Sequence, residues 1–542
     1  MKIKILVLVI VSMASLRSYG QGFENMIDKL LNEKYPATGP GATALVAKEG
    51  EIVYHKAFGM ANLELDVPMQ TDMVFQIASI SKQFTAVSIL MLIEQGKLNL
   101  DDDITKYIED YPTGGKYISI KHLLTHTSGI SRSITQKPWD SNIRKHDFDI
   151  PSWIDYFKNE PKTFSPGEAF QYNNFGYILL SQIIEIVSGI SYGDYVEKNI
   201  FQPLGMHNSR QANDSDIIKN RAYGYEKYDD YVNKQYTSLS WSIGAGSLMS
   251  TVEDLYIWNR ALANNLLISN ESLDLAFTNH QLKNGDEINY GFGWFINEIN
   301  GSPTVEHAGG DHGFRTDAIY LPKEDVFVAI FSNCSCGEPR PISTKIAALT
   351  INKPFEEPTV VATDVEDIYK WVGKYTFKDR STRNVILKDA KLYWVLPNGT
   401  EIMMAAIDNN HFVLENGMTQ IEFKLVADTL VDVSVKNRIS VKTASKPYTT
   451  RREIKLPKKT MTKFVGRYKL SQEFDLTIAW DNGKLTATGT DQDPANLFPE
   501  SPTRFFFKSI DAHIDFILDG QGKSTALEIT QNGVTYSGNK VN

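Results

Sequence analysis

Apolar residues recur at helical spacing in two long stretches of the first two thirds of the chain. The stretch 79–95 places apolar side chains three and four positions apart and ends at Gly96, a residue type that commonly closes helices. The stretch 172–188 repeats such a stripe a few residues after a Ser-Pro-Gly turn. We therefore predict two buried helices. Shorter helical patterns occupy 24–34, 120–126, 255–263 and 342–349.

Alternating and continuous apolar runs flank these helices and predict strands. A hairpin is expected from 42–48 and 52–56, and further strands are expected at 290–294, 304–310, 318–321 and 326–331. Strands thus lie at both ends of the region and helices lie between them. We expect an α+β domain over residues 21–352, in which the two ends meet in one antiparallel sheet flanked by helices.

A repeat with a constant offset of 93 residues organises the rest of the chain. Trp371-Val-Gly-Lys-Tyr375 returns as Phe464-Val-Gly-Arg-Tyr468. Three further blocks keep the offset: Lys391-Leu392 with Lys484-Leu485, Phe412 with Phe505, and Ile421-Glu-Phe423 with Ile514-Asp-Phe516. Both copies are turn-rich β sequence. After a linker at 353–364 we expect two small antiparallel, lipocalin-like β-barrel domains, 365–450 and 460–542.

The first twenty residues read as a secretory signal peptide. Lys2 and Lys4 precede a short apolar core, and small residues lead to a cleavage site expected after Gly20. The apolar core is too short to span a membrane, and we expect no membrane span elsewhere. Without the three cations of residues 1–20, the formal charge changes from −9 to −12, which argues against a nucleic-acid partner. We expect a periplasmic or secreted protein.

The chain has only two cysteines, Cys334 and Cys336. We expect them to lie too close in sequence for an ordinary structural disulfide. Two cysteines alone do not form a metal site, and no phosphate-binding glycine loop is present. We therefore expect neither a metal nor another cofactor.

The start of the first long helix carries a serine and a lysine three residues apart, Ser79 and Lys82. Positions i and i+3 share a helix face, so the lysine amine can reach the serine hydroxyl. A serine hydroxyl becomes an effective nucleophile when a neighbouring base takes its proton. A lysine serves as that base when burial lowers its pKa. The spacing alone is a weak signal, because it often occurs by chance.

Two further motifs follow in chain order, Tyr172-x-Asn174 and His307-x-Gly309. Together with Ser79-x-x-Lys82 they resemble the serine β-lactamase and penicillin-binding protein superfamily, most closely its class C-like branch. That branch includes class C β-lactamases, D-alanyl-D-alanine carboxypeptidases, D-aminopeptidases and related esterases. The phrases Leu123-Leu-Thr-His-Thr-Ser-Gly129 and Pro203-Leu-Gly-Met206 add to the resemblance. It implies an α/β/α sandwich-type penicillin-recognising domain with an additional all-helical subdomain.

The resemblance also implies a role for each motif residue. Ser79 would be the acylated nucleophile and Lys82 the group that takes or shares its proton. Tyr172 would relay protons to the leaving group and to water. Asn174 would hold the substrate amide and the Lys82 amine.

The strand that carries the third motif would lie alongside the bound substrate. Gly309 would allow close approach of the strand, and the N–H groups of Ser79 and Gly310 would form the oxyanion hole. Many members of the superfamily have lysine where this chain has His307. A neutral histidine donates a single hydrogen bond and makes a weaker anion site than lysine. His312 and Arg315 are second choices for residues that line the same cleft.

These expectations define a function. We predict an exported serine hydrolase that cleaves amide or ester bonds through an acyl-enzyme. Its substrates would be small molecules or short peptides, including D-amino-acid peptides derived from peptidoglycan. Two alternatives stay open: a class C-like β-lactamase, and a non-hydrolysing sensor that binds peptidoglycan fragments or penicillins.

Overall fold

The computed structural model describes residues 21–132, 142–211, 213, 215–355, 359–377, 381–397, 399–414, 418–426, 429–438, 441–531 and 534–541. The chain divides into two units, Met1–Phe355 and Glu356–Asn542. The predicted signal peptide and its cleavage site lie outside the described residues.

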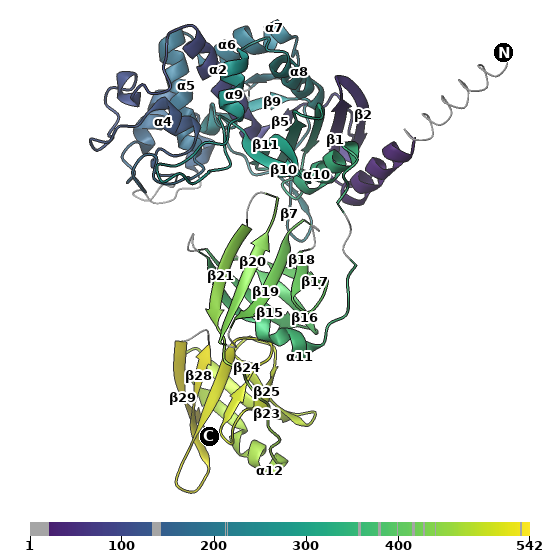
Figure 1. Ribbon diagram of the computed structural model, residues 1–542, viewed down its shortest axis with the longest axis vertical. Helices are drawn as coiled ribbons and strands as arrows, with labels where there is room; N and C mark the ends of the chain where they lie inside the picture. Colours follow the sequence, from purple (N-terminus) through teal and green to yellow (C-terminus); the bar gives the residue numbers. More distant parts are fainter. Residues whose placement is uncertain are drawn as a thin grey trace, which may run out of the picture. The chain divides into compact units, whose positions relative to one another are not determined.

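A six-stranded antiparallel sheet, in the order β10-β11-β12-β13-β1-β2, forms the centre of the first unit (Figure 1). Its strands are β1 (Ala42–Lys48), β2 (Glu51–Phe58), β10 (Phe295–Ile299), β11 (Ser302–Asp311), β12 (Phe314–Leu321) and β13 (Val326–Ser332). Strand β13 is buried along its whole length, as its uninterrupted apolar sequence requires. It pairs with β1, so the two ends of the unit meet in one sheet, as predicted.

Helices cover both faces of this sheet. Helix α10 (Pro339–Thr350) packs on β12 and β13, together with apolar residues of the helical segment 21–34. Helix α8 (Val252–Ala263) packs against β1 and β13, in the same core as α2 (Ser81–Glu94). Because α2 is apolar or small on nearly every side, it runs through the core and holds its first turn rigidly.

A group of helices extends this core. It comprises α3 (Ile120–Leu124), α4 (Ile150–Phe157), α5 (Asn174–Ser188) and α6 (Tyr192–Val196), and α5 contacts each of the others and α2. The predicted α+β domain with a helical subdomain is therefore confirmed. Helix α5 begins at Asn174 because the side chain of Asn173 accepts a hydrogen bond from the N–H of Phe175. Tyr172 thus lies just before the helix.

Two local predictions are wrong. Residues 290–294 form an irregular turn before β10, because Gly293 has a φ of +91° and Gly291 lies so close to Ala276 that no Cβ fits. Cys334 and Cys336 form a disulfide. The turn after β13 brings their Cα atoms to 5.0 Å, within the range that a disulfide spans.

In the described residues no single helix is long and apolar enough to cross a membrane, and one bent pair, Asn174–Ser188 with Tyr192–Leu204, passes that test jointly.

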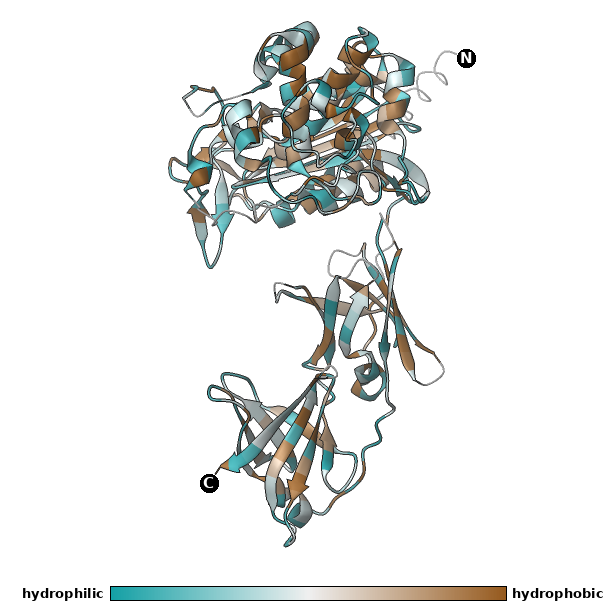
Figure 2. Cartoon of the chain, turned by 90° about the vertical axis from the view of Figure 1, so that its left-hand side faces the viewer, coloured by the Kyte–Doolittle hydropathy of each residue, from teal (hydrophilic) through white to brown (hydrophobic). Residues whose placement is uncertain are grey.

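The second unit consists of two closed, eight-stranded antiparallel barrels, as the repeat predicts. The first contains β14 (Gly373–Phe377), β15 (Thr382–Lys388), β16 (Lys391–Val395), β17 (Glu401–Ala406), β18 (His411–Leu414), β19 (Gln420–Val426), β20 (Leu430–Lys436) and β21 (Val441–Pro447). The second contains β22 (Gly466–Lys469), β23 (Asp475–Asp481), β24 (Lys484–Gly489), β25 (Ala495–Pro499), β26 (Arg504–Phe506), β27 (Ala512–Leu518), β28 (Ser524–Gln531) and β29 (Val534–Val541). Apolar and polar residues alternate along their strands (Figure 2).

The repeated motif makes matching contacts in the two barrels. In the first barrel the Tyr375 hydroxyl donates to the carbonyl of Trp371 at 2.7 Å, and Trp371 stacks on Phe423. In the second, Tyr468 donates to the carbonyl of Phe464 at 2.7 Å. The stacked pair there is Phe464 with Phe516.

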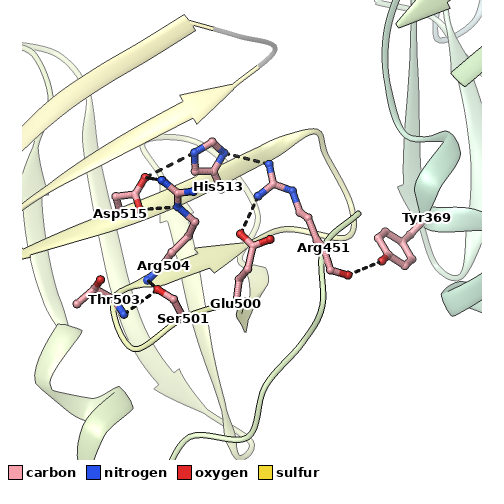
Figure 3. Close-up of polar contacts among 8 residues, drawn as sticks. All are labelled: Tyr369, Arg451, Glu500, Ser501, Thr503, Arg504, His513 and Asp515. Atoms are coloured by element: carbon pink, nitrogen blue, oxygen red, sulfur yellow. Dashed lines mark hydrogen bonds and ion pairs between the residues drawn. The ribbon is translucent and has the colours of Figure 1, made fainter. Parts of the chain in front are cut away.

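The barrels differ in their polar contacts. In the second barrel, Arg504 donates two hydrogen bonds to Asp515 (Figure 3). Arg451 contacts His513 and also donates to Glu500.

The two tyrosines offer a matched test of the repeat. Tyr375→Phe and Tyr468→Phe each leave a buried carbonyl without its hydroxyl donor, which costs about 1 kcal/mol, or roughly a fivefold change in local opening. Tyr468→Phe also removes the contact of the Tyr468 hydroxyl with Ser524 Oγ at 2.8 Å. Hydrogen exchange followed by mass spectrometry on the full-length chain should show faster exchange only in the barrel that carries the substitution. Equal acceleration in both barrels would contradict this assignment.

Candidate active site

Ser79 lies in a short 3₁₀ turn, Ala78–Ile80, between strand β5 (Phe75–Gln76) and helix α2. Ala78 is buried and has a φ of +46°, a left-handed conformation that costs a non-glycine residue about 1–2 kcal/mol. The strained turn is held from the sheet side, where the Thr316 hydroxyl donates to the carbonyl of Ile77 at 3.0 Å. The packing thus fixes the direction of the Ser79 side chain.

Lys82 is completely buried, and three oxygen atoms surround its amine. Its Nζ lies 2.8 Å from Asn174 Oδ1, 2.7 Å from the carbonyl of Ala245 and 3.2 Å from Ser79 Oγ. It also lies 4.8 Å from the ring centre of Tyr172. The structure therefore brings together four of the residues that the sequence singled out, Ser79, Lys82, Tyr172 and Asn174.

Burial lowers the pKa of Lys82 well below 10.5, because desolvation disfavours the ammonium and no carboxylate of the described residues compensates it. A neutral amine has two N–H donors and one lone pair. The amide oxygens of Asn174 and Ala245 can only accept, so they take the two donors. The lone pair is then left for the Ser79 hydroxyl, which is the arrangement that a general base needs.

Tyr172 is half-buried with its hydroxyl shielded from solvent, and desolvation raises its pKa, an effect that the nearby Ser79 hydroxyl and Arg340 partly offset. Its hydroxyl makes no hydrogen bond within 3.5 Å among the described residues. Tyr172 is therefore a neutral phenol at neutral pH. A neutral phenol serves as a proton relay rather than as a standing base.

His307 is buried on β11 in a single tautomer. Its Nδ1 lies 2.7 Å from the carbonyl of Ala308, which only accepts, so Nδ1 carries the proton. Its Nε2 then accepts from the Tyr290 hydroxyl at 3.2 Å. Burial and the nearby Lys82 lower the pKa of His307 to about 3. This neutral ring has no donor left for a substrate anion, so His307 is an even weaker anion site than the sequence indicates.

Gly309 lies against the nucleophile turn. A Cβ atom at this position would lie 2.3 Å from the carbonyl oxygen of Ile77 and 2.2 Å from Thr316 Oγ1. Only glycine therefore lets β11 approach the turn that carries Ser79.

A cavity of about 570 Å³ opens beside these groups. Ser79, Asn174 and Gly310 line it, and so do His312 and Arg315, the two second choices from the sequence. A second cavity of about 470 Å³ shares Asn174 and is lined by the charged residues Arg132, Arg144 and Glu160 and by five aromatic side chains. These are Trp153, Phe157, Tyr172, Phe175 and Trp241.

Sequence reasoning assigned no role to His126. Its ring centre lies 4.4 Å from that of Tyr172, and its Nδ1 accepts from the N–H of Asn173 at 3.1 Å. Burial and the nearby Lys82 and His307 lower its pKa well below 6.5, so the ring is neutral. The phrase Leu123–Gly129 contains this residue, and a buried histidine with a φ of +59° is visible only in the structure.

Ala245 and Tyr290 were also missed. Ala245 contributes a backbone carbonyl, so its side chain leaves no chemical signature in the sequence. The sequence predicts a strand at Tyr290, but this residue lies in the turn that brings its hydroxyl to His307 Nε2 at 3.2 Å. In the described residues no cluster of three His, Cys, Asp or Glu side chains could hold a metal ion.

Comparisons with known proteins match both units. The model of the Beta-lactamase family matches residues 29–351, and a model described as a domain of unknown function (DUF3471) matches residues 450–540. The chain is 31% identical over 424 residues to Penicillin-binding protein 4* of Bacillus subtilis (strain 168), which covers 73% of this chain and 92% of that relative.

Two solved structures show likeness of fold. The octameric penicillin-binding protein homologue from Pyrococcus abyssi has 22% identity and a TM-score of 0.54, over 95% of this chain and 99% of that one. The D-amino acid amidase from Ochrobactrum anthropi SV3 has 22% identity and a TM-score of 0.53, over 61% of this chain and 99% of that one.

The protonation state of Lys82 predicts the pH dependence of Ser79 reactivity. The folded pKa is lowered, so the amine is neutral above that value and reactivity falls about tenfold per pH unit below it. His126 and His307, whose pKa values are also lowered, add no step between about pH 5 and 8. The labelling rate of Ser79 by an uncharged fluorophosphonate, measured against pH, checks this.

The matched control is His307→Gln, which keeps a neutral polar side chain. It should lose Ser79 reactivity at low pH as the unaltered protein does, with the same midpoint pH. A loss at low pH that disappears in His307→Gln would show that the histidine, and not Lys82, titrates.

Gly309→Ala tests the close approach of β11. The new methyl group must displace backbone, which costs about 1–3 kcal/mol and should slow labelling of Ser79 by roughly 10–100-fold. Gly193→Ala is the control, since its Cβ would meet only the Gln211 side chain, at 3.5 Å. Labelling that falls equally in both variants would argue against a specific role for Gly309.

Proposed function

Because the chain belongs to the Beta-lactamase family, a family of serine hydrolases, we propose that it is an exported hydrolase that forms an acyl-enzyme through Ser79. The observation that carries the proposal is the buried Lys82 amine. Its two donors are taken by Asn174 and Ala245, and its third position faces Ser79 Oγ at 3.2 Å.

The geometry supports the following acylation step. Ser79 Oγ attacks the substrate carbonyl carbon while its proton moves to Lys82 Nζ. The N–H groups of Ser79 and Gly310 would stabilise the oxyanion. When the C–N or C–O bond breaks, the leaving group takes a proton from Tyr172, and Tyr172 recovers one from the Lys82 ammonium. Lys82 is thereby neutral again.

Deacylation reverses these roles. A water molecule attacks the ester of Ser79 while Tyr172 and Lys82 together accept its proton, and the Ser79 oxygen receives a proton as it leaves. The neutral phenol of Tyr172 suits such a relay, because it can give one proton only as it gains another.

We propose D-amino-acid-containing peptides, including peptides derived from peptidoglycan, or related amides and esters as substrates. Two of the proteins compared above are described as a penicillin-binding protein and a D-amino acid amidase. The aromatic cavity beside Asn174 offers space for an apolar substituent of such a substrate. The proposed location, periplasmic or extracellular, rests on the signal-like segment 1–20.

The direct test uses a fluorescent penicillin followed by peptide mass mapping. We expect one label, on Ser79, that is absent in Ser79→Ala. In Tyr172→Phe the label should still form, but turnover of an ester substrate should fall by roughly 10²–10³ because the relay is lost. Failure to label Ser79, under conditions that label a known penicillin-binding protein, would contradict the proposal.

A class C-like β-lactamase is the second candidate, favoured by the family match. His307 has no free donor at the position where many members hold the β-lactam carboxylate with lysine, which weighs against efficient β-lactam turnover unless another cation of the cavity binds that carboxylate. Nitrocefin hydrolysis at an ordinary enzymatic rate that is lost in Ser79→Ala would reverse the order. A non-hydrolysing sensor would instead acylate normally and release its acyl group over hours.

A further inference from the structure

We infer that Arg315 is a specificity residue that binds a carboxylate of the substrate beside the oxyanion site. This inference rests on the proposed function and names its substrate class: acyl donors that carry a free carboxylate, as peptidoglycan peptides do. It starts from His307. Because the donor of that ring is used by Ala308, the motif strand provides no side-chain donor for an anion at this position.

Arg315 stands on β12 directly across from Gly310 on β11. Its Nη1 lies 3.3 Å, and its Cζ 3.5 Å, from the position that a Gly310 Cβ would occupy. The guanidinium therefore covers the glycine that we assign to the oxyanion hole. A larger residue at 310 would push this guanidinium away, so Gly310 and Arg315 form one arrangement.

The guanidinium is fixed in position but not neutralised. Its Nη1 donates to the carbonyls of Asp311 and Phe314, each at 2.9 Å. Within the described residues no carboxylate lies within 4 Å of it, and its Nη2 and Nε make no hydrogen bond. Because Arg315 lines the cavity that contains Ser79, its remaining N–H groups are available to a ligand there. Such a preorganised fork matches the geometry of a carboxylate.

The other charged groups that line this cavity do not neutralise Arg315. The carboxylate of Glu226 is held by His312 at 2.7 Å, and that of Asp311 accepts the N–H of His312 at 2.8 Å. Arg144 and Lys227 add two cations to the lining. The two acids thus have partners on the protein, and the three cations outnumber them.

The experiment compares two pairs of substrates on the full-length protein. One pair differs on the leaving-group side: N-acetyl-D-Ala-D-Ala and its C-terminal amide. The other differs on the acyl side: N-succinyl-D-Ala p-nitroanilide and its succinamide analogue. Within each pair, the ratio of kcat/KM for the acid to that for the amide measures carboxylate recognition. The pair that shows the preference locates the carboxylate.

We expect a ratio of at least about 10 in one pair, a fall of about tenfold in Arg315→Gln and a partial recovery in Arg315→Lys. Lys227→Gln is the matched control, because it removes another cation from the lining of the same cavity. It should change the ratio less than twofold if recognition is local. A ratio near 1 in both pairs, a preference that survives Arg315→Gln, or an equal loss in Lys227→Gln would overturn the inference.

Labelling of Ser79 with the uncharged fluorophosphonate separates the two proposals. Label on Ser79 without any carboxylate preference rejects only the role of Arg315. No label on Ser79 rejects the proposed function itself.

Discussion

The burial of a single amine constrains the whole catalytic unit. Desolvation disfavours the charge of Lys82, and no carboxylate in the described part of the chain compensates it, so the folded state favours the neutral form. A buried ammonium of this kind would cost several kcal/mol, whereas a neutral amine with two acceptors costs far less. The fold therefore places Asn174 and the carbonyl of Ala245 around it, from two different parts of the chain. The same constraint that makes Lys82 tolerable in the core makes it a base.

The surrounding side chains follow the same rule. His126 and His307 are buried and neutral, each with Nδ1 engaged by the backbone, and Tyr172 is a neutral phenol. A site without standing charges is easier to bury among apolar residues, and it leaves charge recognition to the rim of the cleft. There Glu226 is held by His312 at 2.7 Å, and Arg315 donates to the backbone carbonyls of Asp311 and Phe314.

Much of this arrangement could be predicted from the sequence. The fold could be predicted because hydrophobic periodicity reports directly on burial. The informative patterns were the hairpin 42–56, the strands around 304–331 and the repeat with an offset of 93 residues. Ser79 and Lys82 could be paired because i,i+3 geometry is local. The position of Asn174 beside Lys82 came only from the resemblance, since contacts between helices are not encoded in any short stretch.

Other features could not be predicted. The carbonyl of Ala245 acts through the backbone, which any residue supplies. The tautomer of His307 depends on its contact with Tyr290. Tyr290 lies in a glycine-containing turn whose sequence pattern predicts a strand. The disulfide between Cys334 and Cys336 depends on the path of the chain after β13. In each case the decisive information is a three-dimensional neighbour rather than a residue type.

The closed barrels have a consequence for how the chain could change in evolution. Every strand from β14 to β21 pairs only within its own barrel, and the same holds for β22 to β29. A closed barrel has no free edge strand to recruit another chain, which limits the risk of edge-to-edge aggregation. The two barrels still share a backbone hydrogen bond, in which the N–H of Leu387 donates to the carbonyl of Ser509 at 3.0 Å. The repeat is thus a unit of duplication. A gene could gain or lose it while the hydrolase core kept its own sheet intact.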